Sequence, residues 1–108
     1  MSLPIYFTQS AERDLLGIYD YIAEHDSPTK ANYVLDQLQE LINALSTNPE
    51  RGTYPKELLS VGMREYRQVY FKPYRVIYRI YSHQILIYLL ADGRRDMQAL
   101  LERRLLNN

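Results

Sequence analysis

Two stretches in the first half of the chain repeat apolar residues with the period of an α-helix. Apolar side chains recur there every three or four residues, which places them on one helical face. They are Ala11, Leu15, Ile18 and Ile22 in the first stretch, and Ala31, Leu35, Leu38, Ile42 and Leu45 in the second. Thr8 or Ser10 can cap the first helix, and Ser27 followed by Pro28 is a typical start for the second. The short polar break between the stretches predicts a helical hairpin.

From Met63 onward the apolar period changes to two, which is typical of β-strands. The predicted strands are Leu3–Phe7 near the start of the chain, then Met63–Phe71, Tyr74–Tyr81 and Gln84–Ala91. Breaks of two residues between the last three strands predict antiparallel hairpins. Pro73 fits poorly as the second residue of a two-residue turn, but a four-residue loop would keep the same strand pairing.

Near the end of the chain, apolar residues again follow a helical spacing and predict a C-terminal amphipathic helix. They are Met97, Leu100, Leu101 and Leu105. The element order becomes β-α-α-β-β-β-α, and a chain of 108 residues suits one domain, 1–108. We expect an α+β fold of two layers, in which the helical hairpin packs on one face of a small antiparallel β-sheet.

Alternation along the strands assigns side chains to two faces of the predicted sheet. The apolar face, expected beneath the helices, holds Arg67, Val69, Phe71, Tyr74, Val76, Tyr78, Ile80, Ile85, Ile87 and Leu89. The opposite face holds Arg64, Tyr66, Gln68, Tyr70, Arg75, Ile77, Arg79, Leu86, Tyr88 and Leu90. The expected cross-strand pairs on that face are Tyr70 with Arg75, Gln68 with Ile77, and Tyr66 with Arg79.

The opposite face combines arginine with tyrosine, and we expect it to be exposed. Such a surface suits nucleic-acid bases and phosphates, and equally an acidic, apolar segment of a protein partner. The alternative is that the C-terminal helix covers part of the face, with the arginines at its rim.

Charge is divided unevenly along the chain, although its sum is zero. Residues 1–50 carry two basic and eight acidic side chains, a net charge of −6, whereas residues 51–108 carry +6. Ten of the 13 basic residues are arginines, and the chain has 11 tyrosines. Arginine pairs well with carboxylate and phosphate, and tyrosine suits contact surfaces. This division predicts a surface for an anionic partner, unless arginine and tyrosine merely occupy a solvated sheet.

Signals of catalysis are sparse in the sequence. The chain has no cysteine, and its two histidines, His25 and His83, fall in predicted turns. The sequence shows no glycine-rich phosphate loop and no metal-ligand spacing, so we expect neither a metal nor a cofactor. Without an apolar run of about 18 residues or a signal-like start, we expect a cytoplasmic protein with no membrane partner. Any chemistry would depend on arginine, tyrosine, lysine or glutamine, since arginine can stabilise the charge of phosphodiester cleavage.

Five short motifs resemble the RelE/ParE superfamily, toxins of type II toxin–antitoxin modules that are often labelled plasmid stabilisation proteins. They are Ala11-Glu12-Arg13-Asp14-Leu15, Ile18-Tyr19-Asp20-Tyr21-Ile22, Asn48-Pro49-Glu50-Arg51-Gly52, Tyr74-Arg75-Val76-Ile77-Tyr78-Arg79 and Gly93-Arg94-Arg95-Asp96. The resemblance covers about the whole chain and implies a helical hairpin on an antiparallel sheet. It also implies a cognate antitoxin, usually encoded beside the toxin, with a segment that folds as it wraps the toxin.

The resemblance leaves two branches of the superfamily open. RelE-like members are ribosome-dependent mRNA endoribonucleases, and Arg75 and Arg95 match arginines of that branch. Tyr66 and Gln68, however, stand where RelE has lysines, and Leu101 stands about where it has a catalytic tyrosine. The last motif and the acidic hairpin look more like ParE, whose members poison DNA gyrase by binding it. We therefore expect a growth-inhibiting DNA gyrase inhibitor rather than an enzyme, with RelE-like cleavage or a toxin fold without toxicity as alternatives.

Seven residues are the expected contacts to the antitoxin and, in the free toxin, to the target. They are Arg64, Tyr66, Tyr70, Arg75, Arg79, Arg94 and Arg95. Forked hydrogen bonds from their guanidinium groups suit the carboxylates of a partner. In the alternative interpretation the strand arginines are structural and hold the sheet through contacts with the tyrosines.

Overall fold

The computed structural model describes residues 2–106, so positions 1, 107 and 108 of the predicted domain 1–108 lie outside it. The helices are α1 (Gln9–His25), α2 (Pro28–Asn43), α3 (Lys56–Leu59) and α4 (Met97–Leu101). The strands are β1 (Ile5–Phe7), β2 (Tyr66–Phe71), β3 (Tyr74–Tyr81) and β4 (Gln84–Asp92). Short helical turns follow α2 at Ala44–Ser46 and Pro49–Arg51, and a π-helical turn, Glu102–Leu106, continues α4. The predicted order is confirmed, with α3 as an addition inside the predicted loop.

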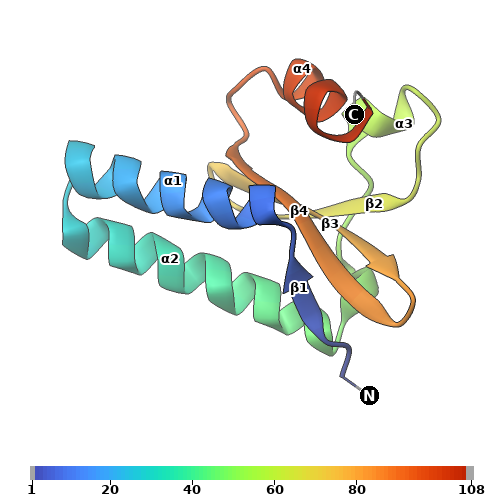
Figure 1. The fold of residues 1–108 in the computed structure, drawn as a ribbon, viewed down its shortest axis with the longest axis horizontal. Helices are drawn as coiled ribbons and strands as arrows, with labels where there is room; N and C mark the ends of the chain where they lie inside the picture. Colours follow the sequence, from blue (N-terminus) through green and yellow to red (C-terminus); the bar gives the residue numbers. More distant parts are fainter. Residues whose placement is uncertain (1, 107–108) are drawn as a thin grey trace.

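Both long helices begin at the residues that the sequence indicates. The Thr8 hydroxyl accepts a hydrogen bond from the Ala11 N–H at 3.1 Å. The Ser27 hydroxyl accepts one from the Lys30 N–H at 3.0 Å, and Pro28 occupies the first helical position. These caps satisfy backbone donors that have no partner within the helix, which is why each helix starts there. The two helices lie side by side as a hairpin along one side of the sheet (Figure 1).

The four strands form one mixed sheet in the order β1-β4-β3-β2. β2, β3 and β4 are antiparallel neighbours, whereas β1 pairs with β4 in parallel, with Ile5 opposite Ile85 and Phe7 opposite Ile87. The prediction of an entirely antiparallel sheet is therefore wrong for β1. The physical reason is that β1 connects to the sheet through the helical hairpin, and such a crossover can return a strand in either direction, unlike a tight turn.

The pairing of β2 with β3 follows the predicted register, including Tyr66 opposite Arg79 and Tyr70 opposite Arg75. Only Lys72 and Pro73 lie between the paired ends of the two strands, so the longer loop is not needed. The Lys72–Pro73 peptide is cis, the form in which a proline occupies the third position of a β-turn.

A β-bulge in β4 changes the predicted faces of its second half. Ile77 lies opposite Leu89, but the next residue, Tyr78, lies opposite Ile87, so Tyr88 is an extra residue. One extra residue shifts every later side chain to the other face. Leu90 therefore packs beneath α1 and α2, while Leu89 packs on the opposite face. The predicted faces of Leu89 and Leu90 are wrong for this reason.

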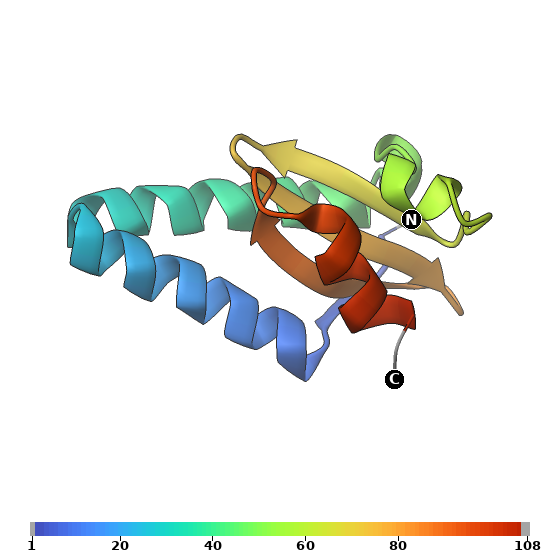
Figure 2. The ribbon, with the colours of Figure 1, turned by 90° about the horizontal axis from the view of Figure 1, so that it is seen from above.

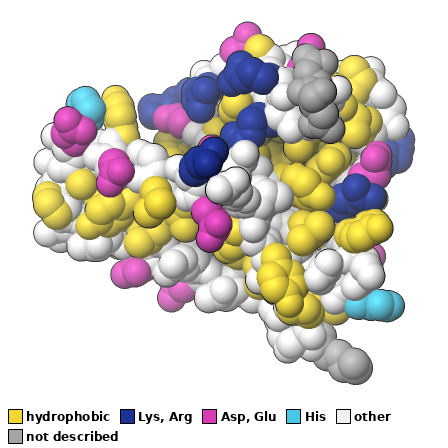
Figure 3. Space-filling view, in the orientation of Figure 1, with side chains coloured by type: hydrophobic (Ala, Val, Ile, Leu, Met, Phe, Trp, Pro, Cys, Tyr) yellow, Lys and Arg dark blue, Asp and Glu magenta, His cyan; other side chains and the backbone are white. Residues whose placement is uncertain are grey.

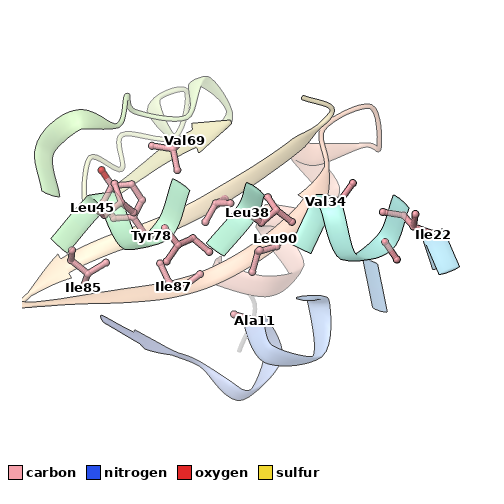
Figure 4. Packing of buried hydrophobic residues seen from close by; sticks show 13 residues of the cluster. Ala11, Ile22, Val34, Leu38, Leu45, Val69, Tyr78, Ile85, Ile87 and Leu90 are labelled. Carbon is pink, nitrogen blue, oxygen red and sulfur yellow. The ribbon is translucent and has the colours of Figure 1, made fainter. Parts of the chain in front are cut away.

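Buried apolar side chains form two clusters, one on each face of the sheet. On the first face, side chains of α1 and α2, among them Ala11, Val34 and Leu38, pack against Tyr78 and Ile87 (Figure 4). On the second face, α3 and α4 cover the sheet, as the view from above shows for α4 (Figure 2). The buried residues of this second cluster are Leu58, Tyr66, Ile77, Leu89, Ala91, Met97, Leu100 and Leu101. The second face is thus largely covered, and the alternative in which the C-terminal helix lies on it is confirmed.

Candidate functional site

Arg75 lies near the start of β3 on the second sheet face and is buried, with only 7% of its surface exposed. Its two terminal nitrogens each donate a hydrogen bond of 2.9 Å to the carboxylate of Glu57 in α3. Its Nε donates to the Gln68 side-chain oxygen at 2.8 Å, and the Gln68 amide donates to the Tyr70 hydroxyl at 2.9 Å. The predicted exposure of Arg75 is wrong, because α3 brings a carboxylate onto the sheet.

The loop after β4 closes over the Arg75 side chain from another direction. A Cβ at Gly93 would lie 2.8 Å from the Arg75 Cδ and 3.1 Å from the Pro73 carbonyl oxygen. Only glycine allows this close approach, which gives the first residue of the Gly93-Arg94-Arg95-Asp96 motif a structural role. The hydrogen bonds from Arg75 hold the pKa of Glu57 below its usual range, although burial opposes this shift.

A second group of predicted residues lies farther along the strands. Tyr66 is 7% exposed and packs edge to face against Tyr88, with 5.2 Å between ring centroids, so its predicted place on an exposed surface is wrong. Burial in the second cluster raises the pKa of the Tyr66 hydroxyl. Arg79 is half-buried and stacks on Tyr81 at 4.9 Å from the ring centroid. Arg64 is exposed, as expected, and Tyr70 is exposed as well.

A third group borders a groove between α1 and the C-terminal end of β4. The groove has a cavity of about 470 Å³, and both Arg94 and Arg95 are exposed beside it. Its lining residues are Arg13, Asp14, Gly17, Ile18, Tyr21, Tyr74, Leu90, Ala91, Asp92, Arg94 and Arg95. In the space-filling view, basic side chains gather above α1, next to the loop that leads into α4 (Figure 3). We call this feature the α1–β4 groove.

The α1 wall of the groove was not among the predicted sites. Arg13, Gly17 and Tyr21 follow one another at intervals of four residues, which places them on one side of the helix. Arg13 lies in the first motif of the family resemblance, Tyr21 lies in the second, and Gly17 lies between the two motifs. Their spacing in the sequence indicates a common side of the helix. That this side forms a groove wall follows only from the position of the loop after β4, which lies opposite.

Both acidic residues of the groove are paired with arginines. The Asp92 carboxylate accepts hydrogen bonds from the Arg94 side chain, the shortest at 2.6 Å, and these bonds hold the pKa of Asp92 below its usual range. The Asp14 carboxylate accepts two hydrogen bonds from Arg104, at 3.1 and 3.0 Å, and one from the Leu90 N–H at 3.0 Å. Across residues 2–106, Arg13 and Arg95 form no ion pair, so the groove retains positive charge.

The Asn48-Pro49-Glu50-Arg51-Gly52 motif is held to the sheet by side chains of β2 and β3. The Tyr78 hydroxyl donates to the Pro49 carbonyl at 2.6 Å and accepts from the Gly52 N–H at 3.0 Å. Arg67 donates to the Gly52 carbonyl at 2.9 Å and to the Tyr54 hydroxyl at 3.1 Å. A Cβ at Gly52 would lie 2.6 Å from the Tyr78 hydroxyl, so this motif also has a structural role.

These arrangements offer guanidinium groups and phenols for binding. The carboxylates of Glu57, Asp14 and Asp92 are each bound by an arginine. In the described part of the chain, no three His, Asp or Glu side chains gather as metal ligands would. None of the described helices has the length and apolar character needed to cross a membrane.

Comparison with known proteins places this geometry in a family. Residues 5–97 match the family model described as the ParE toxin of the type II toxin–antitoxin system, parDE. A search of curated protein sequences found no match.

Three solved structures share the fold. A chain of the chromosomal ParDE system from P. aeruginosa is 19% identical, with a TM-score of 0.69 over 84% of this chain and 96% of that one. A chain of the RelBE2 toxin–antitoxin complex from Mycobacterium tuberculosis is 22% identical, with a TM-score of 0.56 over 85% and 99%. A mutant of the E. coli toxin RelE in which two arginines are replaced by alanine is 14% identical, with a TM-score of 0.61 over 97% of this chain and 100% of that one. The match to the family model covers most of the chain, which therefore belongs to the ParE toxin family of type II toxin–antitoxin systems.

Proposed function

We propose that the chain is a toxin of the ParE branch, which arrests growth by binding DNA gyrase in the bacterial cytoplasm and is neutralised by its cognate antitoxin. The main observation that supports binding rather than cleavage is that the Arg75 side chain is buried and already paired. In the RelE-like interpretation this arginine would have to meet the phosphate of an mRNA. Here its guanidinium is already bound by Glu57 and Gln68 beneath α3.

Two further residues agree with this proposal. Leu101, at about the position of the RelE tyrosine, is fully buried in the second cluster. Tyr66, where RelE has a lysine, is buried too. Cleavage of a phosphodiester needs polar groups placed around the reacting phosphate. Leu101 has an apolar side chain, and the Tyr66 ring packs against Tyr88. Arg64, Tyr70, Arg94 and Arg95 remain exposed, and these are the proposed contact residues, with Arg79 half-exposed beside Tyr81.

The test is to induce the chain alone in bacteria and to score the DNA damage response against cleavage of translated mRNA. We expect growth arrest with a DNA damage response, and rescue when the adjacent gene is co-expressed. With purified gyrase, we expect inhibited supercoiling or stabilised double-strand breaks. Codon-positioned cuts in mRNA would favour the RelE-like alternative, and unimpaired growth at confirmed soluble expression would reject toxicity.

A further inference from the structure

Part of the second sheet face extends beyond the helices that cover the rest. α4 lies over the middle of the sheet, and the β3–β4 turn projects past it (Figure 2). Near this turn, Arg79 and Leu86 are half-buried, whereas Tyr6 and Tyr81 are 53% and 54% exposed. Their neighbours in sequence pack in the first cluster, so alternation turns all four side chains to the second face. We call these four residues the open strip.

The open strip is continuous across the sheet. Leu86 of β4 lies opposite both Tyr6 of β1 and Arg79 of β3, and Arg79 lies opposite Tyr66 of β2. Exposure along this row rises from 7% at Tyr66, within the second cluster, to 53% at Tyr6. Single exposed apolar residues are common on any protein, but neighbouring ones on adjacent strands mark an interaction surface. Hydrophobic side chains gather on this side of the sheet in the space-filling view (Figure 3).

Arg79 is the one charged residue of the open strip. Its guanidinium lies 4.9 Å from the centroid of the Tyr81 ring, a contact that limits its movement while its N–H donors stay in the guanidinium plane. Across residues 2–106 it forms no ion pair, unlike Arg75, Arg94 and Arg104. A partner that covers the strip must therefore supply a carboxylate, since a buried and unpaired guanidinium is costly.

These features fit a protein partner better than a nucleic acid. A strand of nucleic acid needs several cations for its phosphates and free aromatic faces for its bases. The strip has one arginine, which already lies over the Tyr81 ring, and its central residue, Leu86, is aliphatic. Tyrosine and arginine around an aliphatic centre are typical of the contacts that dominate protein–protein interfaces.

The shape of the site indicates a folded partner. Flexible segments bind best in a groove or along a sheet edge, where their backbone gains contacts or hydrogen bonds. The two cavities beside α1, of about 470 and 390 Å³, are lined by other residues and include no member of the open strip. The strip is instead a sheet surface formed by side chains of three strands, which suits the surface of a folded protein.

We propose that DNA gyrase docks on the open strip, with a gyrase carboxylate on Arg79 and a gyrase apolar side chain between Tyr6 and Leu86. The proposal rests on the proposed function, which supplies gyrase as the partner. It goes further in assigning the target to one part of the sheet and in adding Tyr6, Tyr81 and Leu86 to the contacts.

The experiment measures the affinity of full-length variants for purified DNA gyrase, together with the toxin concentration that halves supercoiling. Arg79→Glu places a carboxylate against the partner's carboxylate, so affinity should fall by about tenfold or more. Tyr6→Ala removes an aromatic contact and should lower affinity by a similar factor. Arg79→Lys keeps the charge without the planar fork, so its loss should be smaller than that of Arg79→Glu.

Two matched variants control for loss of charge or of an aromatic ring elsewhere. Tyr33→Ala changes a tyrosine of α2 that is 51% exposed, close to the 53% of Tyr6, and gyrase affinity should stay within about twofold. Arg51→Glu reverses an exposed charge outside the strip and should have as little effect.

Folding is checked in the same samples. The melting temperatures of Arg79→Glu and Tyr6→Ala should stay within about 4 °C of wild type, so that weaker binding reports docking. Where either variant fails to fold, Arg79→Lys and Tyr81→Ala at the exposed end of the strip replace it in the comparison.

The outcomes separate this inference from the proposed function. If the wild-type chain binds gyrase and the folded strip variants bind it equally well, the inference is overturned while the proposed function stands. If the wild-type chain does not bind gyrase, both fail. Arg79-dependent binding of a labelled single-stranded oligonucleotide, or Arg79-dependent self-association in analytical ultracentrifugation, would also overturn the inference when gyrase affinity is unchanged. Either result would assign the open strip to another occupant.

Discussion

The guanidinium of Arg75 and the carboxylate of Glu57 form two parallel hydrogen bonds of 2.9 Å, and the side chains are only 8% and 11% exposed. Arg75 comes from β3 and Glu57 from the four-residue helix α3. A helix this short has little stability of its own, so its position on the sheet depends on such tertiary contacts. The pair therefore links the covering of the second sheet face to one buried ionic contact.

Arg75→Glu should destabilise the fold strongly, because it sets two buried carboxylates against each other. Removing one partner of a buried ion pair costs about 3–5 kcal/mol in the free energy of unfolding. Urea denaturation followed by circular dichroism measures this loss. Arg79→Glu is the matched control on the same strand, where the side chain is half-buried and stacks on Tyr81, so a much smaller loss is expected. Equal midpoints for Arg75→Glu and wild type would show that the pair does not hold the fold.

Stability should fall as the pH drops through the titration of Glu57. Hydrogen bonds from Arg75 lower the pKa of Glu57 from its ordinary value of 4.5, so the unfolded chain binds this proton more readily than the folded one. The stabilisation is complete above the unfolded pKa and is lost as the pH falls through the lower folded pKa. Glu57→Gln should be less stable at neutral pH and show a flatter dependence of melting temperature on pH below about 5.

Asp92→Asn is the control for that titration. The pKa of Asp92 is also lowered, by Arg94, but Asp92 is more exposed than Glu57 and its arginine lies in solvent. The variant should keep most of the wild-type pH dependence. A Glu57→Gln protein with the full acid sensitivity of the wild type would contradict the prediction.

Tyr78→Phe should lower the free energy of unfolding by about 1–3 kcal/mol, because it leaves the buried Gly52 N–H without its acceptor. The Pro49 carbonyl loses its donor in the same variant. Tyr81→Phe, at an exposed tyrosine on the same strand, should stay within about 0.5 kcal/mol of wild type. Chemical denaturation of both proteins decides the matter, and similar losses in the two would refute the anchoring role of Tyr78.

Asp14→Ala should speed hydrogen exchange at the Leu90 amide, since Asp14 is its acceptor at 3.0 Å. The same change frees Arg104, so proteolysis near the end of the chain should accelerate. Asp20→Ala, exposed on the same helix, is the control and should leave both rates unchanged. Unaltered exchange at Leu90 in Asp14→Ala would argue against the contact.

The helical hairpin and the β2–β3 register could be predicted because their signals are local. Thr8, Ser27 and Pro28 act on the residues that follow them, and alternation pairs strands across a short turn. The bulge at Tyr88 has no such signal. Leu89 and Leu90 are both apolar and both buried, one on each face, so the pattern reads equally well in either phase.

The covered state of Arg75 could not be predicted for a related reason. Alternation placed its side chain on the correct face, opposite α1 and α2. What covers that face is decided by Glu57 and Gly93, which are distant in sequence and become neighbours only in the fold. The α1–β4 groove also forms between segments distant in sequence. Arg94 and Arg95 were predicted contacts, but the place of Gly17 in the facing wall could not be predicted from the sequence.

β1 has only three residues and leaves part of the β4 edge open to pairing with a strand of another molecule. β4 spans nine residues, yet β1 pairs only with Ile85 to Ile87, which leaves the rest of that edge without a neighbouring strand. An open edge is a template for intermolecular pairing and fibrous aggregation. Here the Asp14 carboxylate occupies the N–H of Leu90, and Arg104 occupies the carbonyl of Tyr88 at 3.0 Å. The side chains of Asp14 and Arg104 thus bind backbone groups of β4 that a longer β1 would otherwise pair with. At these positions the edge of β4 cannot pair with a strand of a second molecule.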